Sequence, residues 1–197
     1  MTSSDATTAG AAAGPKLPSA AQARIITAAL DLFAQRGVGG TSLQMIADEI
    51  GVTKAAVYHQ YKTKDEIILA AAETELAHLE AVIAEAESEA TPTEAREALV
   101  AGMIELAVTR RRTTSIILGD PVIGGFFAEH DGFRLAMRRM RKLLFGDARG
   151  AETRVQLAML IGATIGAAIH PFLVDLDDKT LRTQLLRLTR RFLDMPG

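Results

Sequence analysis

After Pro18, apolar residues recur at helical spacing along almost the whole chain. The first apolar face has members at i, i+3, i+4 and i+7, namely Ile26, Ala29, Leu30 and Phe33. No segment of the sequence shows the two-residue alternation that is typical of a half-buried strand. The pattern therefore predicts an all-α protein with about nine helices joined by short loops.

Four Ser or Thr residues are each followed, three positions later, by Gln or Glu, which is the spacing of a capping box. These pairs predict helix starts at Ser19, Thr41, Thr63 and Thr91. We expect the helix after Thr63 to be long, and the helix after Thr91 to reach about Arg112. The glycine-rich segment 113–132 is predicted to be the least regular part of the body, and helices are expected over 133–145, 151–173 and 181–195.

Residues 42–64 read as two short helices around a turn at Gly51, followed by a basic and aromatic exit. This is the layout of a helix-turn-helix, whose second helix enters the major groove of DNA. Val57 is expected to pack inward against Phe33 and Ile46, and Tyr61 is expected to pack inside as well. The outer face then carries short, hydroxyl-bearing, basic and imidazole side chains suited to phosphates and base edges: Thr53, Lys54, Ala55, Tyr58 and His59.

Further DNA contacts are predicted on both sides of this helix. The N–H groups at Thr41 and Ser42 could hold a phosphate at the start of the preceding helix, near Gln44. Lys62 and Lys64 would add salt-sensitive attraction to the DNA backbone. The alternative is an ordinary helical hairpin with solvated lysines.

The division of charge favours DNA binding by the N-terminal part alone. The formal net charge of the chain is −2, but residues 16–64 hold six Lys and Arg against three Asp and Glu. The remainder, from Asp65 onward, holds sixteen against twenty. A basic head on an acidic body indicates that only the head meets a polyanion.

Several classes of protein are not supported by the sequence. The chain has no cysteine, which excludes disulfides and thiolate metal sites and suits a reducing cytoplasm. The four histidines lack metal-ligand spacing, and no nucleophile elbow or phosphate-binding loop is present. The longest near-continuous apolar run, 157–169, is shorter than the roughly 20 residues of a membrane span. We therefore expect a cytoplasmic protein that is not an enzyme and uses no metal or cofactor.

The head resembles the tetracycline-repressor (TetR) family of bacterial transcription regulators over about residues 20–68. The matching residues are Arg24 to Leu30, Leu32-Phe33-Ala34, Arg36-Gly37, Thr41-Ser42, Ile46-Ala47, Gly51 to Lys54, Tyr58, Tyr61 and Lys64. The resemblance implies three DNA-binding helices, a helical ligand-binding and dimerisation body, and two-fold dimers. Gln44 stands where the family often has Arg, Lys62 where it often has Pro, and Tyr61 where it often has Phe.

The last two helices are the predicted dimer surface, because residues 155–169 are apolar nearly all round and must be covered on several sides. The predicted interface residues are Leu157, Ile161, Ile165, Ala168, Leu185, Leu188 and Phe192. Gly162 and Gly166 would permit close helix approach. Packing within one chain is the alternative explanation.

A sensor pocket is predicted around the glycine-rich segment, where Met and Phe side chains would form adaptable apolar walls. Its predicted lining is Met103, Ile104, Ala107, Phe126, Phe127, His130, Phe133 and Met137, with Glu105 and His170 as further polar candidates. Each of these residues could instead be an ordinary core residue. The Arg110–Arg112 and Arg138-Arg139 clusters are interpreted as solvated faces, with recognition of an anionic effector as the second interpretation.

Together these features predict a homodimeric regulator that binds a palindromic double-stranded DNA operator and is released by a small apolar effector, as a repressor. The expected organisation is a disordered tail over 1–17, a DNA-binding domain over 18–64 and an effector-binding and dimerisation domain over 65–197. Activation instead of repression is left open by the sequence. The competing hypothesis is a helical small-molecule carrier whose DNA-binding head is vestigial.

Overall fold

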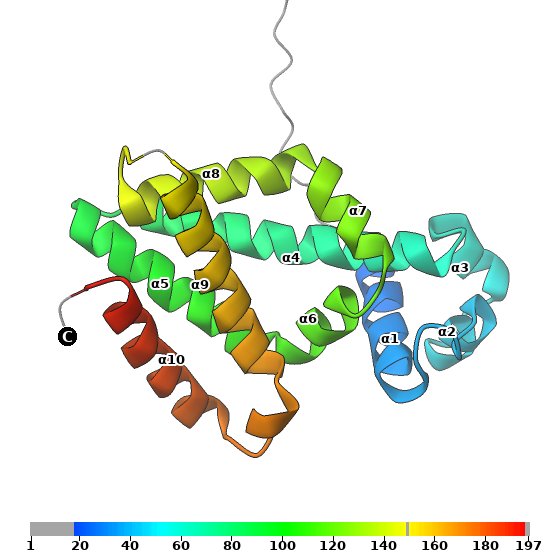
Figure 1. The fold of residues 1–197 in the computed structure, drawn as a ribbon. Helices are drawn as coiled ribbons and strands as arrows, with labels where there is room; N and C mark the ends of the chain where they lie inside the picture. The colour runs from blue at the N-terminus through cyan, green and yellow to red at the C-terminus, as the bar shows by residue number, and fades with distance from the viewer. Residues whose placement is uncertain (1–17, 149, 196–197) are drawn as a thin grey trace, which may run out of the picture.

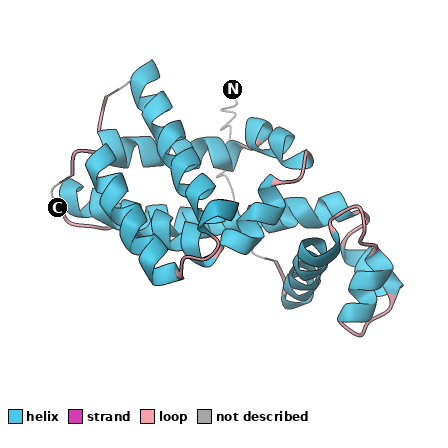
Figure 2. Cartoon of the chain, turned by 60° about the horizontal axis from the view of Figure 1, so that its bottom comes forward, coloured by secondary structure: helices cyan, strands magenta, loops and turns pink. Residues whose placement is uncertain are grey.

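The computed structural model describes residues 18–148 and 150–195, and every regular element within them is a helix, as Figure 2 shows. The ten α-helices are α1 (Ala20–Arg36), α2 (Leu43–Glu49), α3 (Lys54–Gln60), α4 (Lys64–Glu87), α5 (Pro92–Thr109), α6 (Arg111–Leu118), α7 (Val122–Glu129), α8 (Asp131–Phe145), α9 (Ala151–Ile169) and α10 (Asp178–Phe192). A short 3-10 turn covers Pro171–Leu173. The predicted all-α class is confirmed, whereas the predicted tail over 1–17 lies outside the described residues.

The long helix α4 joins the two parts of the molecule (Figure 1). Helices α1, α2 and α3 gather at one end of α4 and form the head. Farther along, α4 packs against α5, α7 and α8, while α10 packs on α5 and α9 crosses the body. One continuous helix thus contributes to the packing of both the head and the body.

Two hydrophobic clusters hold the fold together. The head cluster contains the buried faces of α1, α2 and α3 and also Ile67, Ile68, Ala71 and Ala72 of α4. The body cluster is built on Leu76 and Ile83 of α4 and the buried faces of α5, α8, α9 and α10. The predicted domain boundary after residue 64 thus falls at the first turn of α4, and the head cluster continues beyond it.

Residues 113–132 are more regular than predicted, because α6 and α7 occupy most of this segment. The helix expected to reach Arg112 ends at Thr109, and the described residues form ten α-helices where about nine helices were predicted. Ile117 of α6 and Ile123 of α7 are buried in the head cluster. Their burial outweighs the helix propensity cost of Gly124 and Gly125, which is about 1 kcal/mol for each glycine.

The predicted helix starts are confirmed at Ser19, Thr63 and Thr91, where each side chain accepts a hydrogen bond from the backbone N–H three residues later. The cap predicted at Thr41 is wrong, because Ser42 caps α2 and accepts from Met45 N at 3.2 Å. Thr41 is buried, and its hydroxyl donates to the Gly37 carbonyl at 3.0 Å. Gln44 does not complete a box, since its amide donates to Asp48 Oδ1 at 2.7 Å.

No described helix is both long enough and apolar enough to cross a membrane.

Candidate DNA interface, cavity and dimer surface

The turn between α2 and α3 is fixed by two backbone hydrogen bonds. Gly51 has a φ of +68°, donates to Asp48 O at 3.2 Å, and is followed by Val52, which donates to Ala47 O at 3.0 Å. This is the Schellman arrangement, which favours glycine at the position of positive φ. Arg24 of α1 also donates to Ile50 O at 3.2 Å. The sequence did not assign this role to Arg24, although the turn glycine was predicted correctly.

Helix α3 presents one buried face and one open face. Thr53 caps it by accepting from Ala56 N at 3.2 Å, and Val57 lies fully buried in the head cluster. Tyr61 is buried as predicted, and burial raises the pKa of its phenol. The outward residues are those the sequence predicted, with Tyr58 half exposed and the others exposed: Thr53, Lys54, Ala55 and His59.

Tyr58 and Lys62 act as one unit on the open face. The Lys62 ammonium lies 4.5 Å from the centre of the Tyr58 ring and donates to the Tyr58 carbonyl at 2.8 Å. A cation over an aromatic face is held electrostatically, so both side chains lose freedom before any ligand arrives. The pair therefore offers a positioned positive charge beside a phenol at the end of α3.

Lys64 and Thr41 do not lie where a phosphate clamp would need them. Lys64 Nζ donates to Val38 O at 2.5 Å and to Thr41 O at 2.8 Å, and it is only partly exposed. The Thr41 N–H donates to Val38 O at 3.3 Å and is not free. Both residues brace the connection between α1 and α2. Ser42 is the exposed residue at the start of α2, with Gln44 partly exposed behind it.

A cavity of about 160 Å³ lies in the body and is lined by residues of α4, α5, α6, α7, α8 and α9. Five predicted residues line it, namely Met103, Ala107, Phe127, Phe133 and Met137. The prediction was wrong for the other three. Ile104 is buried in the body cluster, Phe126 packs against both clusters, and His130 caps α8 by accepting from Phe133 N at 3.2 Å.

The further polar candidates also lie elsewhere. Glu105 accepts two hydrogen bonds from Arg182, and His170 accepts from Phe172 N at the start of the 3-10 turn. The sequence missed the polar atoms that do line the cavity, which belong to Glu75, Thr114 and Thr164. They come from α4, α6 and α9, and no local motif marks them.

Glu75 is held by Arg110, which lies at the junction of α5 and α6. The guanidinium donates to the two carboxylate oxygens of Glu75 at 2.6 and 2.5 Å. This hydrogen bonding raises the pKa of Arg110. Glu75 is the one acidic residue among the described cavity-lining residues, and its charge is balanced by this pair. The cavity is therefore apolar with no uncompensated charge in its wall.

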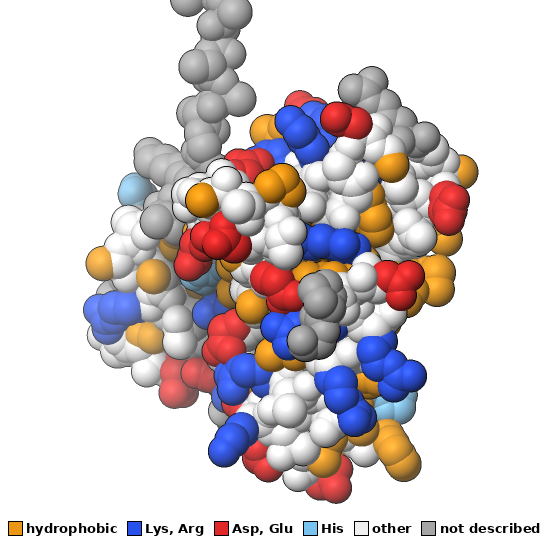
Figure 3. All heavy atoms as spheres, turned by 90° about the vertical axis from the view of Figure 1, so that its left-hand side faces the viewer, with side chains coloured by type: hydrophobic (Ala, Val, Ile, Leu, Met, Phe, Trp, Pro, Cys, Tyr) orange, Lys and Arg blue, Asp and Glu red, His pale blue; other side chains and the backbone are white. Residues whose placement is uncertain are grey.

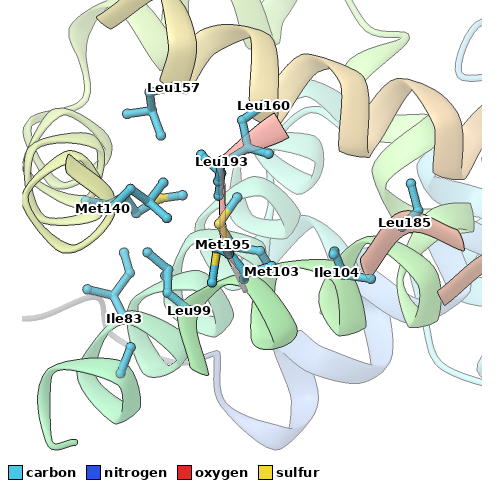
Figure 4. Packing of buried hydrophobic residues seen from close by; sticks show 14 of the residues in the cluster. Ile83, Leu99, Met103, Ile104, Met140, Leu157, Leu160, Leu185, Leu193 and Met195 are labelled. Carbon is cyan, nitrogen blue, oxygen red and sulfur yellow. The ribbon is translucent and has the colours of Figure 1, made fainter. Parts of the chain in front are cut away.

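The outer faces of α9 and α10 carry an exposed apolar surface that differs from the predicted one. Leu188 and Phe192 are exposed as a dimer contact requires, at 52% and 46%. Leu157, Ala168 and Leu185 are buried, and Figure 4 shows Leu157 and Leu185 in the body cluster. Ile161 and Ile165 line the cavity instead. On α9 the open positions include Val155, Met159, Gly162 and Ala163.

We name the surface formed by Val155, Met159, Gly162, Ala163, Leu188 and Phe192 the α9–α10 surface. A Cβ atom added at Gly162 or Gly166 would meet nothing within 4 Å, so these glycines are not required by packing inside the chain. Small residues in open space allow a second helix to approach closely. This surface has the composition that a two-fold contact needs.

Comparison with known proteins places this geometry in a family. Residues 25–71, which span α1, α2, α3 and the start of α4, match the model of the bacterial regulatory proteins of the tetR family. Residues 25–71 therefore carry the sequence pattern of the tetR family. Over 50 residues this chain is 42% identical to an uncharacterized HTH-type transcriptional regulator, YerO, of Bacillus subtilis. That match covers 25% of this chain and only 17% of YerO.

The fold of this chain is shared over nearly its whole length with solved structures. A tetR-family regulatory protein from Rhodococcus RHA1 superposes with a TM-score of 0.72 and 20% identity, covering 91% of this chain and all of that one. SmeT, solved in complex with triclosan, superposes with a TM-score of 0.67 and 25% identity, covering 88% and 91%. The head is thus recognised by sequence, whereas the body is recognised by its fold.

Among the described residues, no group of three or more His, Asp or Glu side chains is arranged to hold a metal ion.

Proposed function

We propose that the protein is a DNA-binding transcriptional regulator that acts as a two-fold dimer and responds to a small molecule. The observation that carries the proposal is the open face of α3, which presents Lys54, Tyr58 and His59 from a rigid turn. The side chains match those that address phosphates and base edges in a major groove. Such a regulator works on chromosomal DNA, so we expect it in the cytoplasm.

Dimerisation is part of the proposal because one head of this size contacts too few bases for useful specificity. A two-fold axis through the α9–α10 surface would present two α3 helices to a palindromic operator, with half-sites about 34–36 Å apart. The exposed Leu188, Phe192 and Met159 support this assignment.

The proposed response runs through α4. Ala72, Glu75, Leu76 and Leu79 of this helix line the cavity, while Ile67, Ile68, Ala71 and Ala72 belong to the head cluster. A molecule that fills the cavity would favour a position of α4 in which the two heads no longer match the operator spacing. Effector binding would then weaken DNA binding, and a repressor that works in this way is released from its operator by the effector.

Fluorescence anisotropy on the DNA upstream of the protein's own gene tests the proposal. We expect specific binding that weakens steeply with salt, since neutralised phosphates release counterions. Lys54→Ala should reduce the slope of log K against log salt by about one for each phosphate that is no longer neutralised, or about two for a dimer. Tyr58→Ala should weaken binding with an unchanged circular dichroism spectrum.

The control is Lys179→Ala, an exposed lysine on α10 far along the chain from the head. It should leave both affinity and salt slope unchanged. If a genome-wide selection finds no DNA site that the protein binds specifically, the proposal is contradicted. The carrier hypothesis, for which the cavity is the only support, would then be favoured. Operator placement relative to the promoter then distinguishes repression from activation.

A further inference from the structure

A second depression, of about 280 Å³, lies on the outside of the body between α8 and α9. Three arginines line it, Arg138 and Arg141 from α8 and Arg154 from α9. Figure 3 views the end of the body at which α8 ends and α9 begins, and Lys and Arg side chains stand beside hydrophobic ones on this face. We name this depression the arginine groove.

The arginine groove and the cavity share a wall. Met137 and Ile161 line both of them, and both side chains are only partly buried. Methionine is unbranched and changes rotamer readily, so a wall that contains it can yield to a ligand. The two spaces are therefore adjacent, and one is apolar and lined by six helices, while the other is open and lined by arginines.

The guanidinium groups of the groove have spare binding capacity. Within residues 18–148 and 150–195, the side chains of Arg138 and Arg154 make no hydrogen bond or ion pair. Arg141 donates one hydrogen bond, from Nη1 to the Ala148 carbonyl oxygen at 2.7 Å. The nearby carboxylate of Glu87 is already held by Arg139 at 2.7 and 3.0 Å, which lowers the pKa of Glu87. Positive charge in the groove is thus left without a partner.

The helix dipoles do not account for this charge. Cations stabilise the last turn of a helix and are unfavourable in the first turn. Arg154 is the fourth residue of α9, and Arg138 lies in the middle of α8. A binding role explains both positions, because the arginine fork matches carboxylate and phosphate oxygens.

We propose that the effector is an amphipathic anion whose short apolar tail enters the cavity past Met137 and Ile161 and whose carboxylate or phosphate group lies on the arginine groove. The proposal rests on the proposed function of the cavity as the effector site. The cavity has the size of an engineered one of roughly 150 Å³ that binds benzene, so the tail holds about six carbons. Because Arg110 already balances Glu75, the cavity does not call for a cationic ligand.

Calorimetric titration of the full chain with six-carbon probes tests the inference. The anionic probes are hexanoate, hexyl phosphate and hexanoyl-coenzyme A, and the comparison probes are hexan-1-ol, hexyltrimethylammonium and coenzyme A without an acyl chain. We expect one or more anionic probes to bind at least about tenfold more tightly than all three comparison probes, as charge-assisted hydrogen bonds allow. The pattern among the three distinguishes a carboxylate, a phosphate and a coenzyme-A thioester.

The double variant Arg138→Gln/Arg154→Gln should lose about tenfold or more of the anion affinity and leave hexan-1-ol binding unchanged. The matched control is Arg187→Gln/Arg191→Gln, two exposed arginines on α10, which should bind as the parent protein does. If the groove variant unfolds, raising the salt on the parent protein from about 0.05 M to about 0.5 M replaces it, because screening weakens only charge-dependent binding.

Equal affinity for the alcohol and the anions, stronger binding of the cationic probe, or anion binding that is insensitive to both the variant and salt would overturn the inference. Operator binding is measured separately by anisotropy. If anions bind in an arginine-dependent way but no operator is found, the proposed regulator function is wrong and the proposed class of ligand stands. If the operator is bound but neutral probes bind more tightly than anions, the regulator function stands and the proposed class of ligand is wrong.

Discussion

At the scale of single residues, Lys54 and Lys64 show how two lysines of one head take different roles. Lys54 is exposed on α3, whereas the Lys64 ammonium satisfies the carbonyls of Val38 and Thr41. We expect Lys64→Ala to lower the free energy of unfolding by about 1–3 kcal/mol, because two carbonyls lose a charged donor. Urea denaturation measures this, and Lys54→Ala is the control with no expected loss. Equal stability of the two variants would contradict the bracing role.

A pH effect is expected from Glu87 and Arg139. The hydrogen bonds of Arg139 lower the pKa of Glu87, so the carboxylate form is favoured in the folded state. Its contribution to stability is present above the unfolded pKa, about 4.3, and is lost as the pH falls through the lower folded value. Since Glu87 is largely exposed, we expect less than about 1 kcal/mol.

Unfolding by urea at about pH 6 and about pH 3 measures this contribution. Arg139→Gln should show a smaller loss of stability between the two conditions than the parent protein does. Arg191→Gln, on the exposed end of α10, should keep the parental difference. An Arg139→Gln variant with the parental pH profile would show that the pair contributes nothing.

At the scale of elements, the contact of α4 with α5 depends on Gly102. A Cβ atom there would lie 2.5 Å from Val82 Cγ1, and the branched valine side chain has little freedom to move aside. We expect Gly102→Ala to destabilise the protein by about 1–3 kcal/mol despite the better helix propensity of alanine. Thermal unfolding checks it.

The control is Gly125→Ala in α7, where an added Cβ meets nothing within 4 Å. It should be neutral or stabilising by up to about 1 kcal/mol, because alanine favours the helix. Destabilisation of both variants to the same degree would show that close approach at Gly102 is not the cause.

Local sequence signals were sufficient for the elements of the head. Ser19, Thr63 and Thr91 cap helices by hydrogen bonds to residues three positions away, and Gly51 supplies a positive φ that few other residues adopt. The choice between Thr41 and Ser42 was missed, because it depends on the burial of Thr41 by the rest of the head. Helices α6 and α7 were missed for the same reason, since contacts distant in sequence outweigh their glycines.

At the scale of the whole molecule, the α9–α10 surface is expected to join two chains. Met159→Glu places a charge on an exposed apolar position, so we expect the dimer to dissociate with little change in the fold of the single chain. Analytical ultracentrifugation measures the change. As a control, Leu157→Ala changes a buried residue of the same helix, so we expect it to lower the free energy of unfolding of the chain by about 2–5 kcal/mol. A dimer that survives Met159→Glu would place the contact elsewhere.

The sites of the body were harder to predict than those of the head. Helix α9 is apolar on nearly every side, so its sequence does not say which side faces the core, the cavity or a second chain. Only once α8 and α10 are in place is Leu157 buried in the core, while Ile161 lines the cavity and Met159 is exposed. Glu75, Thr114 and Thr164 meet in one wall from three distant helices, and no spacing in the sequence relates them.

The sharing of α4 between both clusters has a consequence for any attempt to divide the protein. A fragment that ends at residue 64 would keep α1, α2 and α3 but lose Ile67, Ile68, Ala71 and Ala72, and it would lack Ile117 and Ile123 as well. Without these side chains, Phe33, Ile46 and Val57 would face water. We therefore expect that the head does not fold on its own, and that heat melts the chain in one cooperative transition.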